Sequence, residues 1–314
     1  MRSLGTTHLS IAPLALGGNV FGWTADKKSS FEILDAFVDF GFNLIDTANI
    51  YSTWVEGNKG GESESIIGEW IKKSKKRDRV YIATKVGMEM PGFKGLAKDQ
   101  IIRSVEESLT RLQIEVIDLY QAHKDDPKTP LEETLEAFDQ LVKQGKVRFV
   151  GASNYDAMRL DQALSISQSL GITSYVSLQT YYNLYDRERF EKNLEKLCLT
   201  HQLGILPYFS LAQGFLTGKY RSKEDLPQSP RGSSIERYLD DRGMKIIHAL
   251  DTISRAHHVV PAVIALAWLL QRKGVTAAIA SVTSVKQLTE LAKVSQLRLS
   301  PEEIIKLDHA SSYV

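Results

Sequence analysis

The chain has 314 residues, enough for one large α/β barrel or two ordinary domains, and 43% of them are hydrophobic, as expected of a globular protein. Its 39 basic and 38 acidic side chains leave a net charge of +1, which argues against nucleic-acid or membrane-surface binding driven by bulk charge. A single cysteine, Cys198, excludes an intramolecular disulfide, and its apolar helical surroundings predict a buried side chain. Neither an apolar leader nor a run near the roughly 18 apolar residues of a membrane span is present, so we expect a cytoplasmic protein with no membrane partner.

Short apolar runs alternate with helical patterns from one end of the chain to the other. Residues 2–11 alternate polar and apolar side chains around Gly5-Thr-Thr-His8, which predicts a hairpin that plugs one end of the fold. Strands are predicted near Leu14 and at 43–46, 80–85, 116–123, 147–153, 175–180, 204–208 and 277–282. Helices are predicted at 29–40, 63–73 and 98–112, from Pro130, from Asp156, at 187–201 with Asp186 as N-cap, at 240–257, 261–272 and 284–294, and from Ser300.

Each of the eight predicted strands is followed by a helix or a long loop. Right-handed β–α–β crossovers close eight such units into a barrel. A doubly wound open sheet would require a glycine-rich dinucleotide fingerprint after its first strand, and Gly17-Gly18-Asn19 is not G-x-G-x-x-G. We therefore predict a (β/α)8 TIM barrel, a single domain over 1–314, with an N-terminal hairpin and extra C-terminal helices.

Polar residues close the second, third and fourth predicted strands. Asp46, Lys85 and His123 end these strands, and Tyr51 lies in the loop that leaves the second strand. Since active sites of barrels lie at the carboxyl ends of the strands, the four side chains are expected on one rim as an acid–base set. Tyrosine ordinarily titrates near pH ~10, and a nearby ammonium is expected to lower its pKa. Asp46 would keep the lysine charged, and His123 would orient a carbonyl.

Two alternatives to an acid–base set are compatible with the same residues. Taken singly, Asp46 fits a loop cap, Tyr51 a core position and Lys85 an ordinary buried ion pair. A lysine at the end of a barrel strand also suits an aldolase that forms a Schiff base. A nucleotide site elsewhere in the chain would separate a reductase from such a lyase.

Six motifs, in the expected order, resemble the aldo-keto reductase superfamily and span nearly the whole chain. The resemblance is closest to the bacterial branch that includes general stress reductases and is related to potassium-channel β subunits. The motifs are Asn43-Leu-Ile-Asp-Thr-Ala-Asn-Ile-Tyr51, Gly61-Glu-Ser-Glu-Ser-Ile-Ile-Gly68, Arg79-Val-Tyr-Ile-Ala-Thr-Lys-Val-Gly87, Ile117-Asp-Leu-Tyr-Gln-Ala-His123, Gly145-Lys-Val-Arg-Phe-Val-Gly-Ala-Ser-Asn154 and Leu211-Ala-Gln-Gly-Phe-Leu-Thr-Gly-Lys-Tyr220.

The resemblance implies that NAD(P)H binds in extended form at the barrel mouth. It makes Tyr51 the proton donor, tuned by Lys85 and Asp46, with His123 orienting the carbonyl, and it implies no metal. Tyr208 would stack on the nicotinamide ring. The residues expected to hold the rest of the cofactor, from the nicotinamide through the phosphates to the adenosine, are Gly18, Asn19, Ser153, Asn154, Gln179, Ser210, Leu211, Gln213, Gly214, Lys219, Arg231, Ser281, Thr283, Gln287 and Glu290.

The sequence departs from the family pattern around the cofactor. Tyr208-Phe-Ser-Leu211 replaces the usual Tyr-Ser-Pro-Leu, Ser281 stands where glycine is common, and Leu291 stands where asparagine is frequent. The basic residue that many relatives carry near Thr283 is missing. Lys219 and Arg231, which would reach the phosphates, including the 2′-phosphate, still favour NADPH over NADH.

Three aromatic residues in the loops after the first two strands, Phe21, Trp23 and Trp54, are candidates for the wall of an apolar substrate pocket, although core packing accounts for each equally well. The polar insert at 53–60 is a candidate gate. We therefore expect an NADPH-dependent reductase of aldehydes or ketones. The alternative is a slow-turnover NADPH-sensing subunit that acts through a protein partner. The particular carbonyl, the oligomeric state and the direction in the cell are not readable from the sequence.

Overall fold

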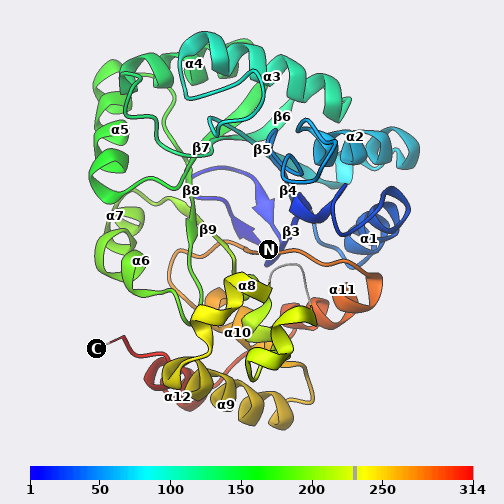
Figure 1. Ribbon diagram of the computed structural model, residues 1–314. Helices are drawn as coiled ribbons and strands as arrows, with labels where there is room; N and C mark the ends of the chain where they lie inside the picture. Colours follow the sequence, from blue (N-terminus) through cyan, green and yellow to red (C-terminus); the bar gives the residue numbers. More distant parts are fainter. Residues whose placement is uncertain (229–231, 314) are drawn as a thin grey trace.

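The computed structural model describes residues 1–228 and 232–313, and its eight-stranded sheet lies at the centre of the molecule (Figure 1). These strands are parallel and hydrogen-bonded in the order β10-β3-β4-β5-β6-β7-β8-β9. The backbone N–H of Thr276, just before β10, donates to the Ile205 carbonyl of β9 over 2.9 Å, so the sheet is nearly closed. The strands are β3 (Leu14–Gly17), β4 (Leu44–Asp46), β5 (Tyr81–Val86), β6 (Ile117–Ala122), β7 (Val147–Ser153), β8 (Ser177–Tyr181), β9 (Gly204–Tyr208) and β10 (Ala278–Ala280).

Helices surround these strands (Figure 1), and the predicted (β/α)8 TIM barrel is confirmed. Several helices begin where a short polar side chain accepts a backbone N–H, as Asp26, Asp156 and Asp240 do. The α-helices are α1 (Lys27–Asp39), α2 (Glu62–Ser74), α3 (Lys98–Leu112), α4 (Leu131–Lys143), α5 (Ala157–Leu170), α6 (Glu188–Asn193), α7 (Glu195–Thr200), α8 (Gly232–Ile235), α9 (Asp241–Ala256), α10 (Pro261–Leu270), α11 (Val285–Ala292) and α12 (Pro301–Ala310). The 3-10 helices are η1 (Gly18–Val20), η2 (Arg77–Arg79), η3 (Ala212–Thr217), η4 (Lys223–Gln228), η5 (Glu236–Tyr238) and η6 (Lys293–Ser295).

The prediction of one helix over 187–201 is wrong. The segment forms two short helices, α6 and α7, separated at Leu194, whose φ is −109°. Asp186 does not cap α6 either, because the N-cap position belongs to Arg187 and makes no side-chain hydrogen bond. The Asp186 carboxylate instead accepts hydrogen bonds from Arg237 and Tyr238 of η5.

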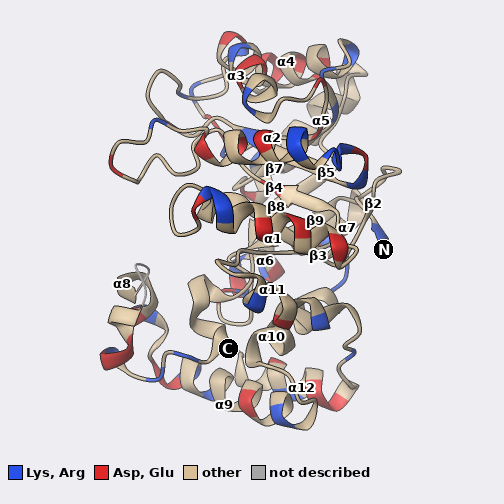
Figure 2. Cartoon of the chain, turned by 90° about the vertical axis from the view of Figure 1, so that its right-hand side faces the viewer, with Lys and Arg blue, Asp and Glu red and all other residues tan. Residues whose placement is uncertain are grey.

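The predicted hairpin is present and lies at the amino ends of the barrel strands. Its strands, β1 (Arg2–Ser3) and β2 (Ser10–Ile11), are antiparallel. Leu4, Leu9 and Ile11 are buried in one cluster with barrel residues such as Leu44 and Leu206. This packing removes apolar surface from water and closes that end. In Figure 2 the N-terminus lies on the opposite side of the barrel from α8, so the open mouth faces α8.

Helix α10 is the most apolar helix, and all of its residues from Ala262 to Leu270 are buried. Among the described residues, no single helix is long and apolar enough to cross a membrane. Helices α9 and α10 reach that length and composition only as a pair bent by 98°. Cys198 is buried, as predicted, and its burial raises the pKa of the thiol to about 12.

The last helix, α12, is joined to the rest of the fold by a charged cluster around Asp308. One Asp308 oxygen accepts hydrogen bonds from Arg187 and Arg272 over 2.8 Å each and from the Trp268 indole over 2.9 Å. The Arg187 side chain is only 9% exposed, and Asp308 is 33% exposed. Removing one partner of a largely buried ion pair leaves the other charge without compensation.

We therefore expect Asp308→Ala to lower the free energy of unfolding by roughly 2–3 kcal/mol, less than for a fully buried pair because Asp308 is a third exposed. Urea denaturation followed by circular dichroism measures this change. The matched control is Glu188→Ala, which breaks the ion pair of Glu188 with Lys192, two side chains that are both more than half exposed. That variant should change stability by under about 0.5 kcal/mol. Equal effects of the two substitutions would contradict the role of Asp308.

Candidate active site

The ends of β4 and β5 bring Asp46, Tyr51 and Lys85 together. The Lys85 ammonium donates to Asp46 Oδ2 over 2.8 Å, to the Thr47 carbonyl over 2.7 Å and to the Tyr51 hydroxyl over 2.9 Å. The Tyr51 hydroxyl also lies 3.4 Å from Asp46 Oδ2. Lys85 is fully buried and Asp46 is 2% exposed. An ammonium carries three protons, and Lys85 has three protein acceptors for them.

The second oxygen of Asp46 is held by two buried amides. Gln179 of β8 donates to Asp46 Oδ1 over 2.8 Å, and Gln121 of β6 donates to the same atom over 3.4 Å. Sequence reasoning missed Gln121, although its position two residues before His123 places it on the same interior face of β6. Asp46 therefore connects the rim of the barrel to the opposite wall.

The sequence predicts that the nearby ammonium lowers the pKa of Tyr51, and the structure reverses this direction. Burial, followed by the nearby Asp46 carboxylate, raises the pKa of Tyr51 well above its ordinary value. Burial also lowers the pKa of Lys85, and Asp46 opposes that shift. The hydroxyl of Tyr51 thus stays protonated at neutral pH and has a proton to give. An ammonium 2.9 Å away would stabilise the phenolate that remains.

His123, which follows β6, is 7% exposed and lies beside Tyr51, with ring centroids 6.0 Å apart. Burial and then the Lys85 charge lower the pKa of His123 well below its ordinary value. The imidazole is therefore neutral at pH 7. Its Nδ1 atom is buried and has no partner among the described residues. A neutral imidazole at this place can accept or donate one hydrogen bond without carrying charge.

The four residues expected at the nicotinamide form two neighbouring groups. The Tyr208 hydroxyl donates to Asn154 Oδ1 over 2.6 Å, and the Asn154 amide donates to Ser153 over 3.1 Å and to the His123 carbonyl over 2.9 Å. Gln179 instead donates to Asp46. Burial raises the pKa of Tyr208 to about 12, so its ring is uncharged. Asn154 has a positive φ of 56°, which is uncommon outside glycine and typical of functional sites.

The turn after β9 has left-handed backbone at Phe209, Ala212, Gln213 and Gly214, with φ of 49°, 47°, 59° and 109°. Three of these residues carry a Cβ, so the conformation costs about 1–3 kcal/mol at each. Left-handed residues in a turn direct successive backbone N–H groups into an anion-binding hollow. In this turn the N–H groups of Ala212 and Gly214 donate to the carbonyls of Phe209 and Leu211, over 2.7 and 2.9 Å.

Other predicted cofactor residues flank this turn. Ser210 is buried and donates to the Pro207 carbonyl over 3.0 Å, and Leu211 packs against the core. Lys219 is exposed, with its ammonium 4.9 Å from the centre of the Tyr220 ring. Arg231 lies outside the described residues.

The residues expected at the adenosine lie around the start of α11. Ser281 donates to the Asn19 side chain over 2.5 Å, which joins the ends of β10 and β3. Gln287 accepts a hydrogen bond from the Thr283 backbone over 2.8 Å, and Glu290 pairs with Lys293. Two further residues are buried, namely Gly18, where a Cβ would lie 2.9 Å from Ser63 Oγ, and Leu291.

The three aromatic residues suggested for the substrate pocket separate into two groups. Phe21 is fully buried in the core, so its side chain has no surface to offer a substrate. Trp23 and Trp54 pack edge to face, with centroids 5.7 Å apart, and Trp54 lies 6.2 Å from Tyr51. Trp54 is 49% exposed. The Trp54 indole therefore lies beside the Tyr51 ring, and Trp23 packs against Trp54 on its other contact.

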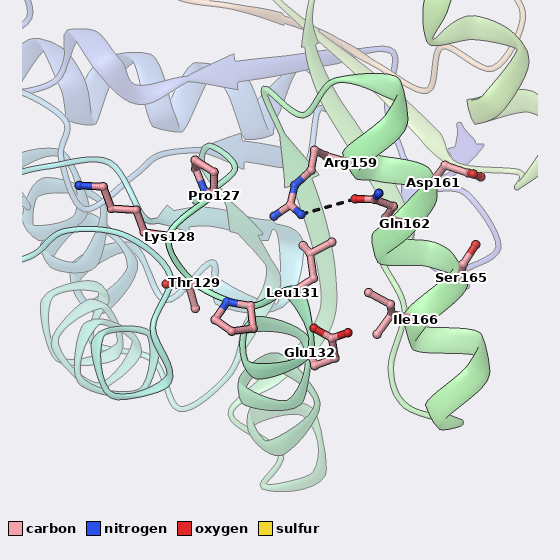
Figure 3. Close-up of a pocket in the computed structure, with 11 residues that line it drawn as sticks. Pro127, Lys128, Thr129, Leu131, Glu132, Arg159, Asp161, Gln162, Ser165 and Ile166 are labelled. Carbon is pink, nitrogen blue, oxygen red and sulfur yellow. Dashed lines mark hydrogen bonds between the residues drawn. The ribbon is translucent and has the colours of Figure 1, made fainter.

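Two surface hollows lie elsewhere and contain none of the four acid–base residues. Figure 3 shows one of about 620 Å³ between the loop before α4 and the first turns of α5, lined by Pro127, Lys128, Thr129, Pro130, Leu131, Glu132, Arg159, Asp161, Gln162, Ser165 and Ile166. The other, of about 730 Å³, lies between α1 and α2. Across residues 1–228 and 232–313, no three His, Cys, Asp or Glu side chains are grouped so that they could hold a metal ion.

Comparisons of this sequence with known proteins find matches over nearly the whole chain. The model of the aldo/keto reductase family matches residues 13–312. Aldo-keto reductase YhdN of Bacillus subtilis is 31% identical over 95% of this chain and 87% of its own length. The uncharacterized oxidoreductase YrpG of the same species is 33% identical over 95% and 92%, respectively. A probable voltage-gated potassium channel subunit beta from Oryza sativa is 29% identical over 98% of this chain and 95% of its own length.

The fold is a (β/α)8 barrel, and its match to the family model supports an oxidoreductase. The chain belongs to the aldo/keto reductase family.

The neutral state of His123 predicts a pH dependence of stability. Below pH ~6.5, this histidine binds a proton in the unfolded chain but not in the native state. The free energy of unfolding therefore falls as the pH falls. His123→Gln takes up no proton in either state. Between pH 7.5 and 5.5, we expect wild type to lose about 1 kcal/mol more than this variant, measured by urea unfolding at both values.

The control for this measurement is His248→Gln, at an exposed histidine of α9, which should keep the wild-type dependence. Identical slopes for wild type and His123→Gln would show that the native imidazole titrates normally.

Proposed function

We propose that this protein is an NADPH-dependent reductase that converts aldehydes or ketones to alcohols, with Tyr51 as the proton donor. The observation that supports this most directly is the Tyr51 hydroxyl, which faces a buried ammonium at 2.9 Å and stands beside a neutral imidazole. A protonated phenol next to a cation can act as a general acid. It gives its proton to the substrate oxygen as negative charge develops there.

The residues of the site have separate tasks in the proposed reaction. Reduced nicotinamide, when bound, supplies the hydride. Tyr51 transfers its hydroxyl proton to the substrate oxygen, and the Lys85 ammonium stabilises the phenolate left on Tyr51. Asp46 holds Lys85 in position and charged. His123, being neutral, orients the carbonyl oxygen by a hydrogen bond without competing for the proton.

The cofactor is proposed to lie along the mouth of the barrel. Asn154, Ser153 and Gln179 would hold the nicotinamide carboxamide, and Tyr208 would face its ring. The left-handed turn at 209–214 would hold the pyrophosphate. Lys219 and Arg231 would favour the 2′-phosphate, and Ser281, Thr283, Gln287 and Glu290 would surround the adenosine. Trp23 and Trp54 would border an apolar or aromatic carbonyl compound.

A Schiff-base lyase fits the site poorly. A lysine that attacks a carbonyl must be neutral and accessible. Lys85 is fully buried, and its nitrogen is directed at three acceptors, one of them a carboxylate. These contacts support an electrostatic rather than a nucleophilic task for this lysine.

Tyr51→Phe tests the proposed mechanism. It should lower kcat for aldehyde reduction by about 10²–10⁴-fold, the range expected when general acid catalysis is removed. Dinucleotide affinity should change less than about threefold, because the ring is retained and the phosphate turn is untouched. Steady-state oxidation of NADPH and fluorescence titration measure the two quantities.

Tyr81→Phe is a matched control, since Tyr81 is at the start of β5, the opposite end of that strand from Lys85. Its kcat should stay within twofold of wild type. Turnover of Tyr51→Phe near the wild-type level would exclude Tyr51 as the proton donor.

A second function is favoured by the similarity to a protein named as a potassium channel subunit beta. Such a chain would hold NADPH, turn over very slowly and act through a protein partner. The same four acid–base residues are compatible with both functions, so only rates separate them.

Titration with NADPH and NADH, followed by a panel of small aldehydes in the same cuvette, distinguishes these functions. We expect tighter binding of NADPH than of NADH and steady turnover of an aromatic aldehyde. Binding of NADPH without turnover would favour the sensing subunit. Failure of both dinucleotides to bind would remove the reductase proposal.

A further inference from the structure

The segment 61–68, which spans the N-cap and the first turns of α2, is one of the six sequence motifs but has no part in the proposed reaction so far. Glu64, in this segment, is fully buried. Its Oε1 atom accepts a hydrogen bond from Thr84 Oγ1 of β5 over 2.6 Å, and its Oε2 atom accepts one from Arg111 Nε of α3 over 2.7 Å. The carboxylate therefore joins the barrel to the neighbouring helix.

The two glycines of the segment make room for Arg111. A Cβ on Gly61 would lie 2.3 Å from Arg111 Cδ, and a Cβ on Gly68 would lie 2.1 Å from the Arg111 carbonyl oxygen. Any other residue at either position would push α3 away from α2. The segment is thus shaped to hold the Glu64 carboxylate against the guanidinium, and this ion pair places a buried negative charge between α2 and β5.

The same segment contacts the surroundings of Lys85 at two points. Thr84, the partner of Glu64, is the residue before Lys85 in β5. Ser63 Oγ accepts a hydrogen bond from Thr47 Oγ1 over 2.8 Å, and the Thr47 carbonyl is one of the three acceptors of the Lys85 ammonium. Two successive residues of α2, Ser63 and Glu64, therefore bond to one acceptor of the ammonium and to its neighbour in the chain.

The charge of Glu64 also acts on Lys85. Burial lowers the pKa of Lys85, and Asp46 and then Glu64 oppose that shift. The Arg111 side chain is 20% exposed and that of Glu64 is 0% exposed, so water screens the guanidinium more than the carboxylate. Glu64 is therefore a second anion, after Asp46, that favours the charged form of the lysine.

Other titratable and charged groups face Lys85 and Glu64 from β4 and the loop after it, from β6 and the loop after it, and from α3, namely Asp46, Tyr51, Tyr120, His123 and Arg111. Burial raises the pKa of Tyr51 and of Tyr120, and it lowers the pKa of His123. These three groups are therefore neutral at pH 7. The charges near the ammonium at that pH are two carboxylates and one guanidinium.

We propose that Glu64 is a positioning residue for Lys85, which fixes the end of β5 through Thr84 and helps to keep the ammonium charged. Successive residues of a strand point to opposite faces, so Glu64 acts from the helix side while Lys85 points into the barrel. Its effect on turnover rests on the proposed function, in which the ammonium stabilises the phenolate of Tyr51. Its effect on the protonation of Lys85 does not depend on that function.

Glu64→Gln removes the charge and keeps the size of the side chain and an acceptor for Thr84. Because loss of a negative charge lowers the pKa of each group that it faces, Lys85 and Tyr51 should both lose their protons at lower pH. We expect the titration midpoint of Lys85 to fall by about 0.5–1 pH unit. NMR of protein labelled with ¹³C at lysine Cε measures it, with Lys85→Arg assigning the signal. The basic limb of kcat for aldehyde reduction should move in the same direction.

Arg111→Met is the matched control, because it breaks the same ion pair and keeps the charge of Glu64. Both variants should lower the free energy of unfolding measured in urea, since both separate α2 from α3. In Arg111→Met, however, the midpoint of Lys85 should stay at or above its wild-type value.

Thr84→Val tests the contact between Glu64 and β5. It removes the hydroxyl and keeps the branched shape, and we expect kcat to fall about five- to tenfold while KM for NADPH stays within about twofold of wild type. Thr84→Ser keeps the hydroxyl and should have a kcat within about twofold of wild type. A loss of the same size in Thr84→Ser would assign the effect to packing of the methyl group and contradict the role of the hydrogen bond.

The outcomes separate the role of Glu64 from the proposed function. If wild type reduces no carbonyl compound but Glu64→Gln still lowers the midpoint of Lys85, the reductase proposal falls and the action of Glu64 on Lys85 stands. If wild type is an active reductase and Glu64→Gln leaves the midpoint and the basic limb unchanged, the role of Glu64 is overturned and the reductase proposal stands. An equal fall of the midpoint in Arg111→Met would assign the effect to loosening of α2 and would again overturn that role.

Discussion

The buried ammonium of Lys85 is the constraint on which the architecture of the site depends. A charge with no exposure to water destabilises the fold unless its protons find acceptors, and here it finds a carboxylate, a carbonyl and a phenol. All three acceptors come from β4 and the loop that follows it. The parallel register that pairs Asp46 with Ala83, two residues before Lys85, brings that loop within reach. The barrel thus fixes Tyr51, the proposed proton donor, because the neighbouring Lys85 ammonium requires an acceptor.

Asp46 extends this requirement across the barrel. One of its oxygens faces Lys85 and Tyr51, and the other accepts from Gln121 and Gln179. Low polarity inside the barrel strengthens each of these bonds and makes any loss costly. Side chains from β4, β5, β6 and β8 therefore act as one network. If Gln179 contacts the nicotinamide, as proposed, a bound cofactor changes the environment of Asp46.

The strands, most helices and the convergence of Asp46, Tyr51, Lys85 and His123 could be predicted because they follow from local patterns and one topological rule. The sequence did not predict the break in one helix, the pKa shift of Tyr51 or the role of Gln121. No glycine or proline in the segment indicates the break between α6 and α7 at Leu194. The pKa of Tyr51 is raised by burial and by the nearby Asp46 carboxylate, and spacing along the chain does not reveal that burial. The sequence does not single out Gln121, because its contact with Asp46 joins two residues that are distant in the chain.

Phe209, which departs from the family pattern, lies in a strained turn beside Tyr181 and Tyr208. Phe209 adopts a φ of 49°, which costs about 1–3 kcal/mol for a residue with a side chain. Its ring packs against Tyr181 and Tyr208 at 5.2 Å each, and its carbonyl accepts a hydrogen bond from Asn183. These contacts offset the strain only while Tyr181 keeps its place. A turn with three strained non-glycine residues therefore requires a fixed neighbour, and β8 supplies one through Tyr181, whose hydroxyl is in turn held by η5.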